Sequence, residues 1–360
     1  MRGPFHHRSA RRRAALLAGA SIALSLMLSL AVLEAVLRVY HHVKVWRENR
    51  ALPPVAARAA IPSRDPELIF EMNPGWSGDG FSVNSFGMAD DEVALEKPPG
   101  VFRIAFVGDS ISANFGLRPR PEIYLNVLAR RLDGEARGGL RFEALNFGVN
   151  AYSLLQSARM LETRALQFAP DLAVAQLCLN DPYPSPTPYA LLTPSGPSRL
   201  WNFLFRRLAP DRFWAWAFVE ANYDGAGMAN VKRGIARFAE IARKGPPVVA
   251  VLFPYLYAPA YDEWGFERFH AYYRETAREA GLPLLDLYPA FRRAGVIRGL
   301  SENRDAIHPD REAHELAGAE ILAHLDRLGM LPKKESSASP VSENAGAEGS
   351  RLGKAVESGR

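Results

Sequence analysis

The clearest pattern along the chain is an alternation of short apolar runs with longer amphipathic stretches, which begins at residue 103. The apolar runs are rich in Val, Ile, Leu or Phe and have the length of strands; they are residues 103–107, 141–147, 171–179, 248–253 and 284–287. The stretches between them carry apolar residues at helical spacing; they are residues 122–132, 154–168, 228–244, 266–280 and 311–328, with glycines at 134, 245 and 281 as expected stops. This alternation predicts a mainly parallel five-stranded sheet covered on both faces, a three-layer α/β/α sandwich.

A different pattern occupies the N-terminus. A basic arm, residues 1–13, carries five arginines, and residues 14–33 then carry no charge. About twenty such residues can cross the hydrocarbon core as a helix, and the arginines favour a cytoplasmic N-terminus. We therefore expect a transmembrane signal anchor over residues 14–37 that places the rest of the chain on the periplasmic or cell-surface side. The alternative is that this segment is a signal peptide, which is cleaved near Ser29-Leu-Ala31 so that the rest of the chain is secreted.

Composition narrows the class of protein further. The formal charge of +5 is that of the basic arm alone, so the remaining residues are neutral in sum and offer no broad surface for nucleic acid. Cys178 is the only cysteine, which excludes an internal disulfide and a cysteine-rich metal site. We expect no cofactor and no metal. Oligomeric state is not readable from the sequence.

The organisation that we expect has five parts. They are the basic arm (1–13), the anchor (14–37), a stalk and lead-in segment (38–100), a catalytic domain (101–328) with an insertion at 182–225, and a disordered tail (329–360). The insertion is rich in aromatic residues, which either pack against the domain or contact sugar or lipid. The tail has almost no large apolar residues and cannot offset its ordering entropy.

The residues that could carry out catalysis follow the ends of predicted strands or lie in loops near them. Ser110 follows the first strand, and Asp305 and His308 lie three residues apart far downstream. A serine hydroxyl becomes a nucleophile when a histidine accepts its proton and a carboxylate orients that histidine. The negative oxygen that then forms needs fixed donors, for which we expect the backbone N–H groups of Ser110 and Gly148 and the side-chain amide of Asn180. All of these residues fall beyond carboxyl ends of strands or in loops near them, where active sites of parallel sheets form.

Four sequence blocks resemble those of the GDSL-type, or SGNH, hydrolases. They are Phe106-Val-Gly-Asp-Ser110, Asn146-Phe-Gly148, Leu179-Asn180-Asp181 and Asp305-Ala-Ile-His308-Pro309. The resemblance covers residues 101–328 and implies a flavodoxin-like fold and ester hydrolysis. It also implies Ser110 as nucleophile, His308 as base, Asp305 as its orienter, and Ser110, Gly148 and Asn180 as the oxyanion hole. Two positions depart from the family pattern, because Cys178 replaces a glycine and Ile111 a leucine.

The substrate that the family and the location imply is a carboxylic ester, such as O-acetyl groups of an envelope or extracellular glycan. The membrane-anchored branch of the family is a weaker, shorter similarity. An O-acyltransferase using the same triad is one alternative, and a non-catalytic envelope protein that binds glycan or aids assembly is another. A metal-assisted hydrolase built on Asp305, His308 and Asp310 is a third. The other histidines of the body, His270, His314 and His324, fit surface or satisfied core positions in helices.

Overall fold

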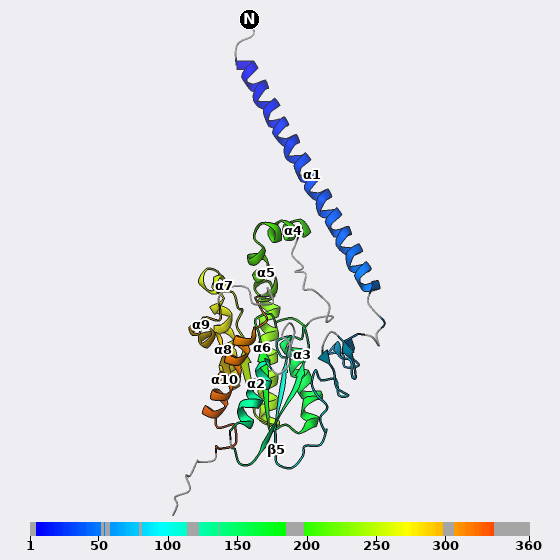
Figure 1. Cartoon of the computed structure of the whole chain (residues 1–360). Coiled ribbons are helices and arrows are strands. Elements are labelled where there is room, and N and C mark those ends of the chain that lie inside the picture. The colour runs from blue at the N-terminus through cyan, green and yellow to red at the C-terminus, as the bar shows by residue number, and fades with distance from the viewer. Residues whose placement is uncertain are drawn as a thin grey trace, which may run out of the picture.

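The computed structural model describes most of the chain: residues 5–51, 54, 58–78, 81–113, 122–135, 137–184, 198–297 and 306–334. Figure 1 shows a compact α/β domain below one long helix, α1 (Phe5–Ala51). Asp305 and residues 335–360, which make up most of the expected tail, lie outside the described residues.

The centre of the domain is a five-stranded parallel sheet, as the apolar runs predict. Its strands are β5 (Val101–Gly108), β6 (Arg141–Gly148), β7 (Leu172–Leu177), β8 (Val248–Leu252) and β9 (Leu284–Asp286). Their order is β6-β5-β7-β8-β9, and each neighbouring pair is parallel. Because all strands point the same way, their carboxyl ends meet at one edge of the sheet, which we call the catalytic edge.

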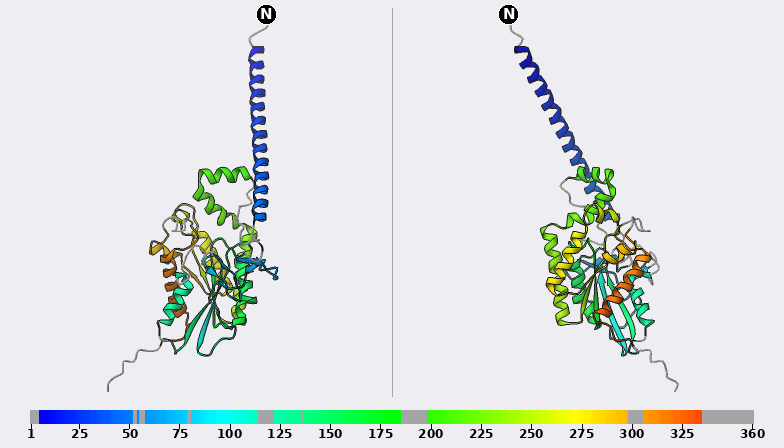
Figure 2. Two further views of the ribbon diagram at one scale, coloured as in Figure 1. Left: turned by 45° about the vertical axis from the view of Figure 1, so that its right-hand side comes forward. Right: turned by 90° about the vertical axis from the view of Figure 1, so that its left-hand side faces the viewer.

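Helices cover both faces of the sheet (Figures 1 and 2). One face carries α2 (Tyr124–Asp133), α9 (Tyr288–Arg293) and α10 (Arg311–Arg327), and the other carries α3 (Leu154–Thr163), α6 (Gly225–Lys244) and α8 (Glu267–Ala280). Strand β5 supplies side chains to both layers, because Ile104 and Phe106 face one core and Ala105 and Val107 the other. The expected three-layer sandwich is confirmed.

The helices begin and end at residues with clear capping chemistry. Ser153 and Gln156 form a reciprocal capping box at the start of α3, and the Asp310 carboxylate accepts the Ala313 N–H at the start of α10. Gly281 ends α8 with a φ of 69°, a left-handed conformation that glycine adopts without strain. The other two expected stops, Gly134 and Gly245, also lie directly after the helices that they end.

The lead-in segment packs beside the sheet as two small antiparallel hairpins. Strands β1 (Ala60–Pro62) and β2 (Phe70–Met72) form the first, and β3 (Ser77–Gly78) and β4 (Phe81–Ser82) form the second. At the other end of the domain, Leu331 is buried and the Pro332 carbonyl accepts a hydrogen bond from Arg137. Residues 329–334 therefore pack on the domain, although we expected the disordered tail to begin at 329.

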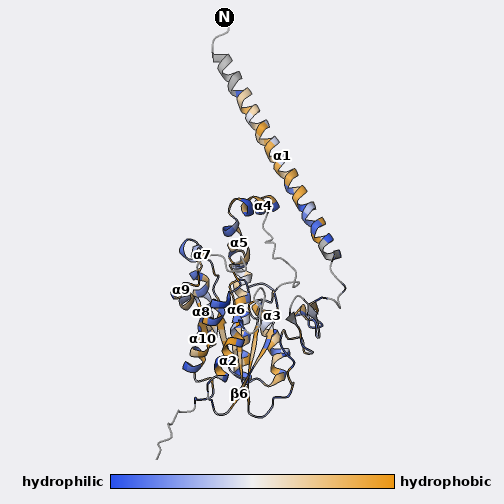
Figure 3. Cartoon of the chain, in the orientation of Figure 1, coloured by the Kyte–Doolittle hydropathy of each residue, from blue (hydrophilic) through white to orange (hydrophobic). Residues whose placement is uncertain are grey.

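The insertion and α1 lie together outside the sandwich. The insertion contains α4 (Arg199–Leu208), α5 (Pro210–Phe218) and the short turn Glu220–Asn222. Within α1, the segment Arg13–Arg47 is long and apolar enough to cross a membrane, as a signal sequence near an N-terminus can also be. Its large apolar side chains are exposed, and Figure 3 shows this apolar stretch along the helix.

Candidate active site

Ser110 and His308 meet at the catalytic edge. Ser110 lies in the turn directly after β5, and His308 lies in the loop before α10. The His308 Nε2 atom is 2.9 Å from the Ser110 Oγ atom, although the residues are 198 positions apart in the chain. Ser110 is only 5% exposed, so its hydroxyl is sheltered from bulk water. With Nε2 unprotonated, this geometry lets the imidazole accept the hydroxyl proton.

The expected orienter of His308, Asp305, lies outside the described residues. The loop that follows it is anchored, because the Ala306 carbonyl accepts the Leu256 N–H at 2.6 Å. Asp310, which we considered as a metal ligand, uses its carboxylate to cap α10.

The turn of residues 109–112, which carries the expected nucleophile and is called the nucleophile turn below, is held by polar contacts on both sides of Ser110. The Asp109 carboxylate accepts the Ile111 N–H at 3.0 Å, which is the turn-stabilising role that such an aspartate is suited to. Gln176 of β7 accepts the Asp109 N–H and the Ser112 hydroxyl, each at 3.0 Å. Ser112 is fully buried and also bonds the Tyr124 hydroxyl, so it is a structural serine, whereas the Ser110 hydroxyl faces His308.

Gly148 brings the end of β6 against the nucleophile turn. A Cβ atom at this position would lie 2.5 Å from the Ser112 Cβ, so only glycine fits. The Gly148 N–H donates to the Asn146 Oδ1 atom at 3.0 Å, and the Asn146 amide donates to the Ser112 carbonyl at 2.8 Å. The donor that we expected to face the oxyanion is therefore engaged by Asn146.

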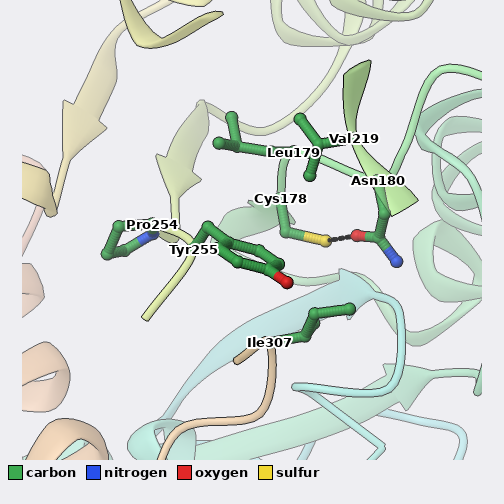
Figure 4. A pocket seen from close by; sticks show the side chains of 7 residues that line it. All are labelled: Cys178, Leu179, Asn180, Val219, Pro254, Tyr255 and Ile307. Atoms are coloured by element: carbon green, nitrogen blue, oxygen red, sulfur yellow. Dashed lines mark hydrogen bonds between the residues drawn. The ribbon is translucent and has the colours of Figure 1, made fainter. Parts of the chain in front are cut away.

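The other two expected donors remain available. Among the described residues, the N–H of Ser110 has no hydrogen-bond partner. Asn180 lies just beyond β7, and its Oδ1 atom accepts a close hydrogen bond from the Cys178 thiol. Figure 4 shows that the Asn180 amide nitrogen points away from this sulfur. Cys178 thus fixes the carboxamide with its NH₂ group turned outward.

Three buried acidic groups lie behind this turn. Ligand atoms of Asp109, Cys178 and Asp181 lie within 4.8 Å of one another, a spacing that could suit a metal. The Cys178 sulfur lies 3.0 Å from an Asp109 carboxylate oxygen, and the Cys178 N–H donates to Asp181 at 2.7 Å. Burial, and then the nearby Asp109 charge, raise the pKa of both Cys178 and Asp181. Metal binding requires Cys178 and Asp181 to lose their protons, whereas this environment favours the protonated forms of both.

A small pocket adjoins the site (Figure 4). Its lining is mostly apolar and comes from the carboxyl ends of β7 and β8, the insertion and the His308 loop; the residues are Cys178, Leu179, Asn180, Val219, Pro254, Tyr255 and Ile307. Because Asn180 lines it and Ile307 directly precedes His308, the pocket lies beside both of these expected site residues.

The other histidines of the domain, His270, His314 and His324, lie in helices, as predicted. His270 is fully buried, with its Nδ1 atom 2.8 Å from Asp286 and its Nε2 atom 3.1 Å from the Tyr261 hydroxyl. His314 accepts the Tyr124 N–H at 3.2 Å and stacks on the Tyr124 ring. Burial, and then the neighbouring His308, lower the pKa of His314 to about 3. Burial is also the main cause of the lowered pKa of His324.

Two supporting residues carried weak signals in the sequence. Gln176 is the single polar residue in the apolar strand Leu172–Leu177, and such a position suggests a specific buried partner. Asn146 shares a sequence block with Gly148, whose N–H it accepts, yet its other side-chain hydrogen bond goes to Ser112, more than thirty residues away in the chain. Neither partner can be deduced from local pattern.

Comparison with known proteins agrees with this geometry. The model of the GDSL-like lipase/acylhydrolase family matches residues 106–316, which is more than half of the chain and includes Ser110, Gly148, Asn180, Asp305 and His308. A search of curated proteins gave no match.

Several solved structures are similar at low sequence identity. Axe2, an acetylxylan esterase from Geobacillus stearothermophilus, is 13% identical with a TM-score of 0.43, and the match covers 62% of this chain and 94% of Axe2. TesA is 21% identical with a TM-score of 0.41, over 63% of this chain and 99% of TesA. LAE5, an alpha/beta hydrolase from the metagenome of Lake Arreo, Spain, is 18% identical with a TM-score of 0.44, over 63% of this chain and 96% of LAE5. On the family match, the chain belongs to the GDSL-like lipase/acylhydrolase family and is a serine hydrolase that acts on esters.

Proposed function

We propose that this enzyme removes short acyl groups, with O-acetyl esters of an envelope or extracellular glycan as the substrate class, through an acyl-Ser110 intermediate. The observation that carries the proposal is the 2.9 Å contact between Ser110 Oγ and His308 Nε2 at the catalytic edge. Both atoms lie within hydrogen-bond reach, which is what nucleophile activation requires. The short acyl group and the glycan are proposed from the family match and from the expected extracytoplasmic location of the domain.

In the proposed reaction, Ser110 Oγ attacks the ester carbonyl carbon while His308 Nε2 takes the hydroxyl proton. The negative oxygen of the tetrahedral intermediate is stabilised by the Ser110 N–H and the Asn180 amide; Gly148 could add a third donor only by giving up its bond to Asn146. The intermediate collapses, the alcohol leaves with the proton from His308, and the acyl group stays on Ser110. Water then attacks this acyl-enzyme while His308 takes its proton, the bond between the acyl carbon and Ser110 Oγ breaks, His308 returns the proton to Oγ, and the free acid is released. Asp305 is proposed to orient His308 and stabilise its charged form.

The location is part of the same proposal. We assign residues 14–37 to an uncleaved anchor with the enzyme domain on the extracytoplasmic side, because arginines precede the apolar segment. An exposed apolar helix joined to an esterase domain would hold the enzyme next to envelope material.

The proposal is tested by labelling the full chain in detergent with a fluorophosphonate probe and mapping the modified residue by mass spectrometry. We expect the label on Ser110, no label in Ser110→Ala, and retained labelling in Ser112→Ala, because Ser112 is buried and bonded to Tyr124. A label on another residue would overturn the assignment of the nucleophile.

A panel of esters from acetyl to long-chain acyl groups, with a sugar acceptor present, then tests the substrate. Release of acetate, fastest for the shortest acyl group, is the expected result. Acetylated sugar in place of free acetate would identify a transferase, and binding of glycan without turnover in both wild type and Ser110→Ala would identify a non-catalytic protein.

A further inference from the structure

Helix α4 presents large apolar side chains to solvent. Trp201, Leu204 and Leu208 are 56%, 42% and 82% exposed, and their three- and four-residue spacing places them along one side of the helix. Phe203 is exposed as well. Phe205, whose ring also lies 5.7 Å from that of Trp201, packs against Phe213 and Trp216 of α5, with ring centroids 5.6 and 6.0 Å apart. The helix is thus held by α5 while its apolar side is left uncovered by the described residues.

The start of α4 is fixed to α1 at one residue, Glu34. The Glu34 carboxylate accepts the Arg199 and Leu200 N–H groups at 3.0 and 2.8 Å and the Ser198 hydroxyl at 2.9 Å. Figure 2 shows α4 lying crosswise to α1 at this point. Glu34 directly follows the uncharged residues 14–33, which as a helix span about 30 Å, the thickness of the hydrocarbon core. Helix α4 therefore lies at the level where α1 would leave the lipid.

Cationic groups gather at the same level. Arg206 and Arg207 occupy the last turn of α4. An open pocket between the two helices is lined by Arg38, His41, His42 and Val45 of α1 and by Arg199 of α4. A short helix with an exposed apolar side and flanking arginines is the pattern of a helix that lies in a membrane interface and prefers anionic lipid.

We propose that α4 is a second membrane contact, which lies in the surface of an anionic phospholipid bilayer beside the point where α1 emerges. Trp201, Leu204 and Leu208 would enter the acyl-chain boundary, and the arginines would meet lipid phosphates. This proposal rests on the anchor proposed above and not on the chemistry of the site. Because the insertion follows the carboxyl end of β7, the docked helix turns the catalytic edge toward the membrane. The preferred substrates are then esters held close to the bilayer.

The test places a spin label on single introduced cysteines of the full chain in nanodiscs that contain anionic lipid. Cys178 does not compete for the label, because it is fully buried and burial raises its thiol pKa. Leu208→Cys reports on α4, Leu24→Cys on the anchor, and Arg278→Cys on α8 at the opposite edge of the sheet. Residue 208 is so exposed that the substitution removes little packing.

The readout is the collision rate of each label with oxygen, which concentrates in lipid, compared with that of a water-soluble nickel complex. We expect labels at 208 and 24 to favour oxygen and the label at 278 to favour the nickel complex. Equal ratios at 208 and 278 would overturn the docking of α4. A fall in both collision rates at 208 would show that a second copy of the chain covers it. A label at 24 that favours the nickel complex would refute the anchor and, with it, the docking, while leaving the esterase proposal untouched.

Discussion

At the scale of single residues, the environment of Asn180 distinguishes this site from the family pattern. The position two residues before it is Cys178, where a glycine is usual, and the thiol is bonded to the Asn180 Oδ1 atom. A glycine could not make this contact, since it has no side chain. The carboxamide orientation in this enzyme therefore depends on a sulfur that also contacts Asp109.

This dependence predicts a selective effect of Cys178→Ala. Loss of the thiol frees the Asn180 carboxamide, so kcat should fall up to about tenfold with KM nearly unchanged, in line with one hydrogen bond of about 1 kcal/mol. Removing the donor itself in Asn180→Ala should lower kcat by about 10²- to 10³-fold. Steady-state kinetics of the double variant should show no further loss from Cys178→Ala. If Cys178→Ala weakens the Asn180→Ala enzyme by the same factor, the residue does not act through Asn180.

The environment of His314 predicts that the folded protein loses stability in acid. Its pKa of about 3 in the folded protein lies below the ordinary value near 6.5, so between these values the unfolded chain binds a proton that the folded chain does not. The free energy of unfolding should therefore fall as pH falls through this range, with His314 contributing about 1.4 kcal/mol per pH unit. Urea unfolding between pH 4 and 7 measures the slope, and His314→Asn should make it shallower. Identical slopes in both proteins would contradict the assignment.

At the scale of elements, buried Arg103 joins the sheet to the lead-in segment. Its guanidinium donates to the carbonyls of Ala94, Leu95 and Phe168 and pairs with Glu143 at 2.8 Å. No side chain other than an arginine offers five donors in one plane, so these segments depend on this residue.

The pairing with Glu143 offers a matched comparison, because Arg141 pairs with the same carboxylate from an exposed position. Arg103→Met should lower the free energy of unfolding by about 3 to 5 kcal/mol, since it leaves buried acceptors without a donor. Arg141→Met should cost less than about 1 kcal/mol. Denaturant titration of the two variants compares the costs, and similar values would mean that burial does not set the importance of Arg103.

The elements themselves were largely predictable, whereas the contacts between them were not. The strands, the helices and the glycine stops follow from local periodicity, and the family blocks predict Ser110, Asn180 and His308 as site residues. The bonds from Gln176 and Asn146 to the nucleophile turn require knowledge of which loops converge. Gly148 was expected to donate its N–H to the oxyanion, but this N–H donates to Asn146 instead. The sequence indicates a tight turn at Gly148 but not this hydrogen bond.

At the scale of the whole molecule, the esterase domain is joined to an N-terminal apolar helix by the lead-in segment and contacts that helix through one insertion. Helix α4 links the two parts, because it follows the catalytic edge in the chain and bonds Glu34 of α1 in space. The aromatic residues of the insertion divide into two groups, with Phe213 buried against the rings of Phe205 and Trp216 and Trp201 exposed on α4. With the proposed anchor and the proposed α4 contact, this arrangement sets the distance between the enzyme domain and the membrane.

We propose that Ser110 and His308 act together as nucleophile and base, and a double-mutant cycle of these two residues tests that coupling. Kinetics of ester hydrolysis should be measured for Ser110→Ala, His308→Ala and the double variant, with thermal unfolding to verify that each is folded. Each single variant should lose at least about 10⁴-fold in kcat/KM, and the double variant should lose no more than either, because each group is useless without the other. Losses that multiply in the double variant, or a single variant that keeps near wild-type turnover, would contradict the account.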